Sequence, residues 1–223
     1  METSKERYIP ALGYKILTPL YDPIVAITCR EKTFKQALLI QAGIKNGHQV
    51  LDLGCGTGTF AVQMKRSMPS AKVISIDGDE QILEIARSKS KKEGVKVEFH
   101  RCDASQLPFD DNRFDRVVSS LFFHHLIMDQ KISVLREVFR VLRHGGELHI
   151  ADWGKPTSRM MRLLFYFIQM LDGFESTQDN VQGLLPVVLR DCGFKQPTLR
   201  DTIPTAFGTM ALYSAVKPEQ NPR

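Results

Sequence analysis

Three glycines stand two residues apart in the segment VLDLGCGTGTF, after a run that predicts a strand and before a pattern that predicts a helix. They are Gly54, Gly56 and Gly58. Because glycine has no Cβ, its backbone can take positive φ in a tight turn and a ligand can lie against it. The N-terminus of the following helix would point free N–H groups at that ligand. The pattern predicts a ligand-binding loop, with a purely structural turn as the alternative.

The spacing of this loop is G-x-G-x-G, whereas dinucleotide-binding folds use G-x-G-x-x-G. Thr59 stands where the third glycine of a dinucleotide site would be. The loop therefore favours a cofactor without a pyrophosphate, lying across the turn. Nicotinamide-dependent reduction stays an alternative, which a comparison of nucleotide preference would test.

Acidic residues follow the next two expected strands. Asp77 ends the first strand after the glycine loop, and a carboxylate at this position can accept hydrogen bonds from both hydroxyls of a ribose. Asp103 follows the third strand and could accept a hydrogen bond from the exocyclic amine of a base, with apolar surface nearby at 107–109. The alternatives are an ordinary strand-end or capping role for Asp77 and an Asx-turn for Asp103.

The elements that must position these residues alternate between short apolar β-rich runs and helical patterns over residues 49–152, which is typical of βαβ units around a parallel sheet. Asp79 and Asp129 are expected to cap helices, and Gly145 is expected to end the second of these. Strands are expected at 49–53, 73–76, 95–99, 115–120, 147–151, near 194–201 and at 209–216; helices are expected at 79–93, 129–143, 160–171 and, after a polar linker, up to Cys192.

Several stretches together resemble the class I S-adenosylmethionine-dependent methyltransferases: LDLGCGTG, the acidic Asp77, CDASQLPF, FDRVVSSLFFHHL and VLRHGGELHIADW, in order and spacing over residues 47–152. The nearest resemblance is to the small-molecule branch that includes ubiquinone and menaquinone biosynthesis methyltransferases. It implies an α/β, Rossmann-like, doubly wound seven-stranded sheet in the order 3-2-1-4-5-7-6, with the last strand antiparallel. It also implies a single domain over 1–223, with an N-terminal helical lid at 1–47 and a helical substrate cap at 153–192.

The resemblance further implies an S-adenosylmethionine site that releases S-adenosylhomocysteine and contains no metal. The glycine loop would pass the methionine part of the cofactor, Asp77 would hold the ribose, and Asp103 with Ala104 would hold the adenine. Ser119 and Ser120 would border the sulfonium. The full set of expected cofactor-binding residues is Asp52, Gly54, Cys55, Gly56, Gly58, Asp77, Gly78, Asp103, Ala104, Ser119 and Ser120.

Two adjacent histidines, His124 and His125, follow the fourth expected strand at the edge where such sheets bind ligands. Methyl transfer from a sulfonium is an in-line displacement in which positioning alone can suffice. A hydroxyl or an acidic carbon gains from a nearby base, and histidine suits that task. We expect at least one of the two to act as base or to orient the acceptor; the alternative is that one packs structurally and the other is merely exposed.

The acceptor pocket is expected to be hydrophobic or amphipathic, which favours O- or C-methylation. Its expected lining is Tyr8, Tyr14, Tyr21, Trp153 and the insertion SRMMRLLFYFIQMLDGF. The apolar residues of that insertion could instead form core or a dimer face. With Arg159 and Arg162 at its start, the same helix could contact an anionic membrane surface.

Composition limits the remaining classes. The 223 residues are 43% hydrophobic and 25% charged, which excludes a disordered chain, and no apolar run reaches the length of a membrane span. The net charge of +5 is spread along the chain, so a nucleic-acid partner is not expected, although an RNA or protein methyltransferase stays an alternative. A non-catalytic cofactor-binding module is another. A polar N-terminus and four cysteines without a CxxC pair predict a cytoplasmic protein, and the oligomeric state stays open.

Overall fold

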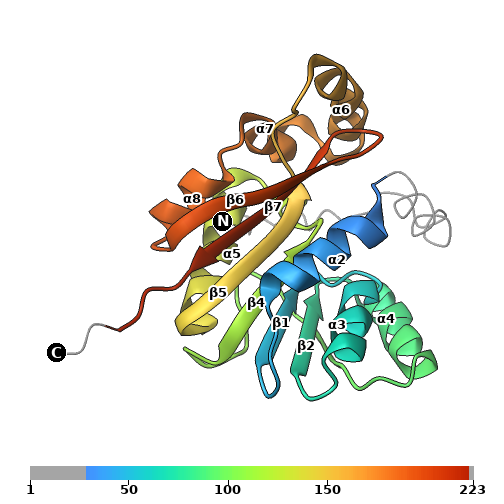
Figure 1. The fold of residues 1–223 in the computed structure, drawn as a ribbon, viewed down its shortest axis with the longest axis vertical. Coiled ribbons are helices and arrows are strands. Elements are labelled where there is room, and N and C mark those ends of the chain that lie inside the picture. Colours follow the sequence, from blue (N-terminus) through green and yellow to red (C-terminus); the bar gives the residue numbers. More distant parts are fainter. Residues whose placement is uncertain (1–28, 221–223) are drawn as a thin grey trace, which may run out of the picture.

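The computed structural model describes residues 29–220. Its centre is one seven-stranded sheet in the order β3-β2-β1-β4-β5-β7-β6 (Figure 1). β7 runs antiparallel to both of its neighbours, and the pairings from β3 to β5 are parallel. The predicted fold class is confirmed. The strands are β1 (Gln49–Leu53), β2 (Lys72–Asp77), β3 (Glu98–Arg101), β4 (Phe114–Ser120), β5 (Leu142–Trp153), β6 (Lys195–Pro204) and β7 (Thr209–Val216).

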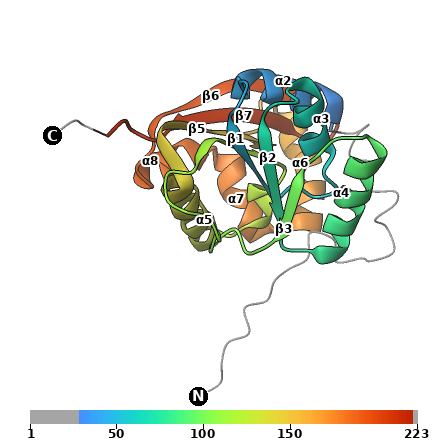
Figure 2. The same cartoon turned by 90° about the horizontal axis from the view of Figure 1, so that it is seen from below.

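Helices cover both faces of the sheet, with α2 and α3 on one side and α5 and α7 on the other (Figure 2). Residues on α2 and α3 join one apolar cluster, and residues on α5 and α8 join a second. The apolar residues of β1 contribute to both clusters, so the central strands are buried on both faces. The helices are α2 (Glu31–Ala42), α3 (Thr59–Ser67), α4 (Glu80–Lys92), the 3-10 turn η1 (Phe123–His125), α5 (Met128–Val141), α6 (Arg159–Asp172), α7 (Phe174–Gln182) and α8 (Leu185–Asp191).

The third strand begins later than predicted, at Glu98 and not at residue 95. Val95 still belongs to the turn that closes α4, because its N–H donates to the carbonyl of Ser90 while the Ser90 hydroxyl donates to the carbonyl of Val95. The backbone groups of Val95 are therefore not free to join the ladder with β2, which starts at Ile74 and Glu98.

The helix expected over 129–143 occupies Met128–Val141, and Asp129 lies in its first turn and is not its cap. The side chain of Gln130 instead accepts the N–H of Ile127. Gly145 does not end this helix. It takes a φ of +71° inside β5, where its N–H donates to the carbonyl of Lys217, because the chain is already extended from Leu142 onward.

The prediction of a polar linker after residue 171 is wrong, because most of that segment forms helix α7. The polar residues of α7 face inward and surround the ammonium group of Lys131, which is 1% exposed. The Lys131 Nζ lies 2.6 Å from a carboxylate oxygen of Asp179 and 3.0 Å from the Oδ1 of Asn180. A helix can therefore be buried through its polar face when that face neutralises a buried charge.

The carboxyl ends of β1, β4 and β5 meet at one edge of the sheet, and α6 and α7 lie beyond the end of β5 (Figure 1). Asn180 ties α7 to this edge, since its Nδ2 donates to the carbonyl of Trp153 over 2.7 Å. Helix α2 belongs to the part of the chain expected to form the lid, and it packs on the sheet through Phe34 and Leu38. The rest of the expected lid, residues 1–28, lies outside the described residues. The lid and cap assignments stay predictions.

Candidate functional site

The glycine loop follows β1, and all three of its glycines have positive φ, between +53° and +74°. A Cβ at Gly54 would lie 2.4 Å from the ring of Phe122, and one at Gly58 would lie 2.8 Å from the Cβ of Ala86. A Cβ at Gly56 would meet nothing within 4 Å. Gly54 and Gly58 are therefore required by packing, whereas Gly56 leaves backbone uncovered where a ligand can lie.

Replacing Gly58 with alanine is expected to destabilise the fold. The new residue would have to keep a φ of +74° and would press against Ala86, so both backbone strain and overlap act against it. We expect a loss of about 2–4 kcal/mol, measured as a lower midpoint of thermal unfolding.

The matched control is Gly47→Ala, because Gly47 has a similar φ of +79° but open space around a Cβ. This control carries the backbone strain without the overlap, so its loss should be clearly smaller. Equal losses for the two variants would show that packing against Ala86 does not constrain the loop.

Asp77 connects the loop to the end of β2. Its Oδ2 accepts the N–H of Gly56 over 2.9 Å, and its Oδ1 accepts the N–H of Asp79 over 3.0 Å. Burial raises the pKa of Asp77 despite these backbone hydrogen bonds. The backbone of Gly78 also contributes a hydrogen bond to this carboxylate, whose remaining acceptor capacity could serve a ribose hydroxyl. Asp79 caps α4 by accepting the N–H of Gln81, as predicted.

Two expected cofactor residues, Asp52 near the end of β1 and the partly exposed Cys55 in the glycine loop, have raised pKa values. Asp52 is 1% exposed, and burial raises its pKa to about 7 against the opposing charge of Lys35. The hydroxyl of Ser75 donates to Asp52 over 3.5 Å. Burial also raises the pKa of the Cys55 thiol, so this group stays protonated at neutral pH and is not a nucleophile. Their contacts with a cofactor stay predictions.

The other expected cofactor residues make local contacts. The Oδ1 of Asp103 accepts both the N–H and the hydroxyl of Ser105 over 2.8 Å, which is the Asx-turn considered as the alternative. The hydroxyl of Ser119 donates to the carbonyl of Leu53 inside the sheet. Gly78, Ala104 and Ser120 are partly exposed, and Ser120 ends β4. The cofactor roles of these residues stay predictions.

The two histidines form the turn η1 directly after β4, and the structure gives them unequal surroundings. The Nδ1 of His124 lies 2.7 Å from the Oδ1 of Asp152 at the end of β5. The other oxygen of Asp152 accepts the backbone N–H groups of Phe122, Phe123 and His124. One buried carboxylate therefore fixes both the turn and the ring of His124.

A second carboxylate closes the cluster from the cap. The Oδ2 of Asp172, the last residue of α6, lies 3.6 Å from the Nε2 of His124, and its Oδ1 lies 4.0 Å from the Nδ1 of His125. The two imidazole rings pack against each other at a tilt, with centroids 3.9 Å apart. Among the described residues, the Nε2 of His124 makes no hydrogen bond and faces the Asp172 carboxylate, and His124 as a whole is 3% exposed.

Electrostatics separates the two histidines. Burial alone lowers the pKa of His124, but the charge and hydrogen bond of Asp152, with a contribution from Asp172, raise it on balance. Burial and the neighbouring charge of His124 lower the pKa of His125 to about 3. Because Asp152 holds Nδ1–H, the basic atom of His124 is Nε2. The cluster can therefore take a proton on His124 while His125 stays neutral.

His124, His125 and Asp172 place possible ligand atoms within 4.8 Å of one another. Imidazole and carboxylate groups are also the types of ligand that bind divalent ions. Two ligands about 2.1 Å from a tetrahedral ion are about 3.4 Å apart. Both carboxylate–imidazole distances, 3.6 and 4.0 Å, are longer than that. The expected absence of a metal stays a prediction.

The structure shows two partners of the histidines, Asp152 and Asp172, that were not predicted from the sequence. Asp152 is the residue before Trp153 at the carboxyl end of β5, and the parallel pairing of β4 with β5 could have placed it beside His124. Asp172 carries no such signal, because only the packing of α6 brings it to the histidines.

The expected acceptor-pocket residues divide into two groups. Tyr8, Tyr14 and Tyr21 lie outside the described residues. Trp153 is 3% exposed and packs edge-on against Phe165 of α6, with ring centroids 5.5 Å apart. The pocket assignment of all four stays a prediction.

Comparison with known proteins agrees with this geometry. Residues 50–146 match the family model described as a methyltransferase domain. The chain is 27% identical over 208 residues to the ubiquinone/menaquinone biosynthesis C-methyltransferase UbiE of Pseudomonas putida (strain W619), covering 84% of this chain and 79% of that protein. The protein of the same name from Pasteurella multocida (strain Pm70) is 34% identical over 139 residues, which cover 61% of this chain and 51% of the relative.

A solved structure shows the same fold at low identity. The crystal structure of the [4+2]-cyclase SpnF aligns with a TM-score of 0.72 and 19% identity, covering 93% of this chain and 95% of the other. The family match over residues 50–146, the sheet order and the curated relatives support a class I S-adenosylmethionine-dependent methyltransferase. Within that class it resembles the ubiquinone and menaquinone biosynthesis C-methyltransferases, as its sequence motifs predicted.

Within residues 29–220, no helix is long and apolar enough to cross a membrane.

Proposed function

We propose that this chain transfers a methyl group from S-adenosylmethionine to a carbon or oxygen atom of a small hydrophobic acceptor, with His124 as the general base. The observation that carries the proposal is the 2.7 Å contact between His124 and Asp152 beside the glycine loop. The turn that bears His124 abuts that loop, since the ring of Phe122 fills the space next to Gly54.

The residues of the loop fit the cofactor. Gly56 leaves open backbone, and the carboxylate of Asp77 lies next to it with lone pairs to spare. S-adenosylmethionine, when bound, supplies a methyl group on a positively charged sulfur that keeps the electron pair of the broken bond. Asp77 would hold the ribose, and the loop of Gly54, Cys55 and Gly56 would lie along the methionine part.

The chain's own contribution to the chemistry is removal of a proton. A phenol or an acidic carbon becomes a better nucleophile as its proton leaves, and Nε2 of His124 can take that proton. Asp152 holds the opposite ring nitrogen and stabilises the imidazolium that forms. Asp172 faces the same Nε2 over 3.6 Å and adds negative charge to the protonated state.

The class of acceptor is proposed from the relatives and from the cap. The curated relatives are named as C-methyltransferases of ubiquinone and menaquinone biosynthesis, and these names point to a quinone-type acceptor. The insertion that bears Asp172 is rich in methionine and aromatic residues, which form adaptable walls for such a ligand. We further propose that Tyr8, Tyr14 and Tyr21 complete the pocket and that the enzyme acts in the cytoplasm.

The decisive experiment incubates the chain with S-adenosylmethionine and a panel of hydroquinones and phenols, and follows S-adenosylhomocysteine together with methylated product. We expect product only with acceptors that carry an acidic hydroxyl or ring carbon. Binding of S-adenosylhomocysteine without turnover on any acceptor would favour a non-methylating use of the fold. The similarity to SpnF, a [4+2]-cyclase, favours this alternative.

Metal removal should have little effect on this reaction. Because the base is an imidazole held by a carboxylate, dialysis against EDTA is expected to change the turnover number by less than about twofold. The check is turnover before and after dialysis, followed by addition of Mg²⁺ or Zn²⁺. Loss of activity that a divalent ion restores would show that the histidine–aspartate cluster binds metal.

A further inference from the structure

Large apolar side chains are exposed along one helix at the edge of the molecule. Most of the strongly exposed large hydrophobic residues belong to α6 or directly follow it, and Met170 reaches 73% exposure. Only Phe165, Ile168 and Gln169 of α6 are buried. The exposed members are Met160, Leu163, Leu164, Tyr166, Phe167, Met170, Leu171 and Phe174.

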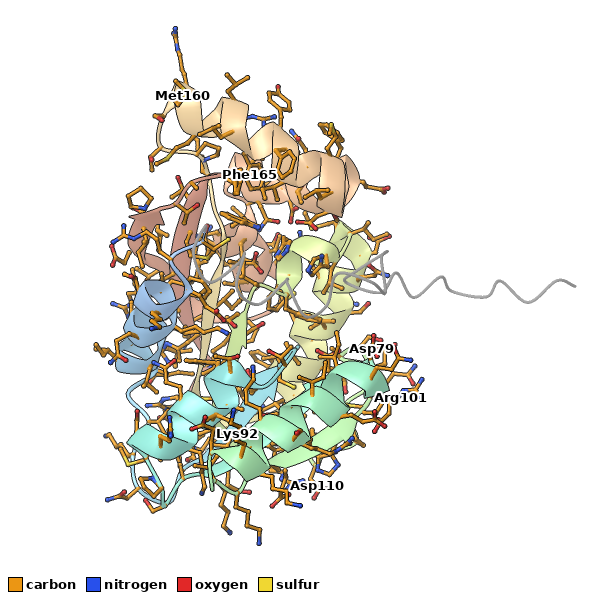
Figure 3. The ribbon with its side chains drawn as sticks, turned by 90° about the vertical axis from the view of Figure 1, so that its right-hand side faces the viewer. Asp79, Lys92, Arg101, Asp110, Met160 and Phe165 are labelled. Atoms are coloured by element: carbon orange, nitrogen blue, oxygen red, sulfur yellow. The ribbon has the colours of Figure 1, made fainter. Side chains whose placement is uncertain are left out.

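This arrangement is the reverse of an ordinary surface helix, which turns a polar face to water. Figure 3 places Met160 at the outer end of the molecule and Phe165 on the side of α6 that faces the body. Phe165 packs against Trp153 and Phe167 stacks on Phe207, so these contacts hold the helix to the fold while most of its other apolar side chains stay exposed. Contiguous exposed apolar surface of this kind marks a contact with another apolar phase or partner.

The charges around this surface point to an anionic partner. Residues 159–171 contain no acidic side chain, whereas Arg159 and Arg162 lie in the first turn and Lys155 precedes it. The guanidinium of Arg162 lies over the ring of Tyr166 at 4.0 Å, which combines basic and aromatic character on one patch. Basic residues beside exposed aromatic and aliphatic ones are typical of helices that lie in the headgroup region of a bilayer.

The acidic residue at the far end of the helix does not oppose this contact. Asp172 turns inward and lies 3.6 Å from His124. The exposed surface therefore runs from the basic end of α6 to the candidate active site. A hydrophobic molecule in the outer part of a bilayer could reach that site along the helix.

We propose that the exposed face of α6, residues 160–171 with the flanking Lys155 and Phe174, docks on the surface of a lipid bilayer that carries anionic headgroups. The apolar side chains enter the acyl boundary and the basic end contacts the headgroups. The proposal concerns binding alone and holds whether or not methyl transfer is the reaction.

The test measures co-sedimentation of the full chain with vesicles of phosphatidylglycerol and phosphatidylcholine, and with vesicles of phosphatidylcholine alone. We expect at least tenfold stronger binding to the anionic vesicles, weakened by salt. Replacing Leu163 and Met170 by glutamate should lower this binding at least tenfold. Leu163 is 64% exposed and Met170 is 73% exposed, so the fold should tolerate the change.

The matched control is Ile40→Glu on α2, which is 71% exposed but far from the patch in sequence. It should bind vesicles like the wild type. Equal binding of the Leu163 and Met170 variants and the wild type would overturn the proposal, as would absence of binding to anionic vesicles. Sedimentation velocity without lipid is a second readout: a dimer that the glutamate variants dissociate would assign the surface to a second copy instead.

Discussion

His124→Gln is expected to lower the turnover number by about 10²–10⁴-fold at saturating S-adenosylmethionine and acceptor. Glutamine fills a similar space and can still donate to Asp152, so the turn should persist while the basic nitrogen is lost. The affinity for S-adenosylhomocysteine should stay within about twofold of wild type. The reason is that His124 follows β4 whereas Asp77 ends β2, and these two strands flank β1 on opposite sides. Single-turnover kinetics and calorimetric titration measure the two quantities.

The pH dependence of the wild-type enzyme follows from the same residue. A base works only when unprotonated, and the pKa of His124 is raised above its ordinary value of 6.5. Turnover should therefore fall as the pH drops through a midpoint above 6.5. Burial of His124 lowers this midpoint, the carboxylates of Asp152 on β5 and Asp172 on α6 raise it, and the charge of Lys131 on α5 lowers it. The residual turnover of His124→Gln should not show this transition.

The matched control is His125→Gln. Its ring packs against His124 but its pKa is about 3, so it is neutral over the whole working range and cannot provide the pH transition. We expect less than a tenfold loss of turnover with the pH profile retained. Unchanged turnover in His124→Gln would show that His124 is not the general base. Loss of the pH transition in His125→Gln would assign that transition to His125.

Much of the fold could be predicted because its signals are local or carried by short motifs. The glycine loop, Asp77 at the end of β2 and the cap at Asp79 each depend on a few neighbouring residues. Strand β7 was predicted at its observed bounds, since a largely apolar run separates it from its flanks. The family resemblance then supplied the strand order, which local patterns alone do not fix.

The remainder depends on contacts between distant parts of the chain. Helix α7 looks like a linker in sequence, and its folding depends on long-range contacts such as the burial of Lys131 against Asp179 and the hydrogen bond from Asn180 to Trp153. Asp172 meets His124 only because α6 packs back over the end of the sheet. The histidine pair could be found from the sequence, and the pairing of β4 with β5 could have placed Asp152 beside it. Asp172 could not be found, because the packing of α6 on a distant turn leaves no periodic trace in the sequence.

Asp77→Ala is expected to weaken binding of S-adenosylhomocysteine by about 10²–10⁴-fold. A carboxylate that accepts both ribose hydroxyls contributes two charge-assisted hydrogen bonds, each of about 1.5–3 kcal/mol. The substitution also releases the N–H of Gly56, which the Oδ2 of Asp77 holds at 2.9 Å, so the loop loses its anchor. Isothermal titration with S-adenosylhomocysteine, and with NAD(H) as a comparison, measures the effect.

Asp79→Ala separates cofactor binding from loss of structure. Asp79 caps α4 through the N–H of Gln81, so its removal should cost about 1 kcal/mol of stability and leave the affinity for S-adenosylhomocysteine nearly unchanged. Asp77→Ala should lose affinity even where its thermal unfolding matches that control. If a folded Asp77→Ala variant binds as tightly as the wild type, the ribose is held elsewhere, and the carboxylate of Asp77 serves only to fix the glycine loop.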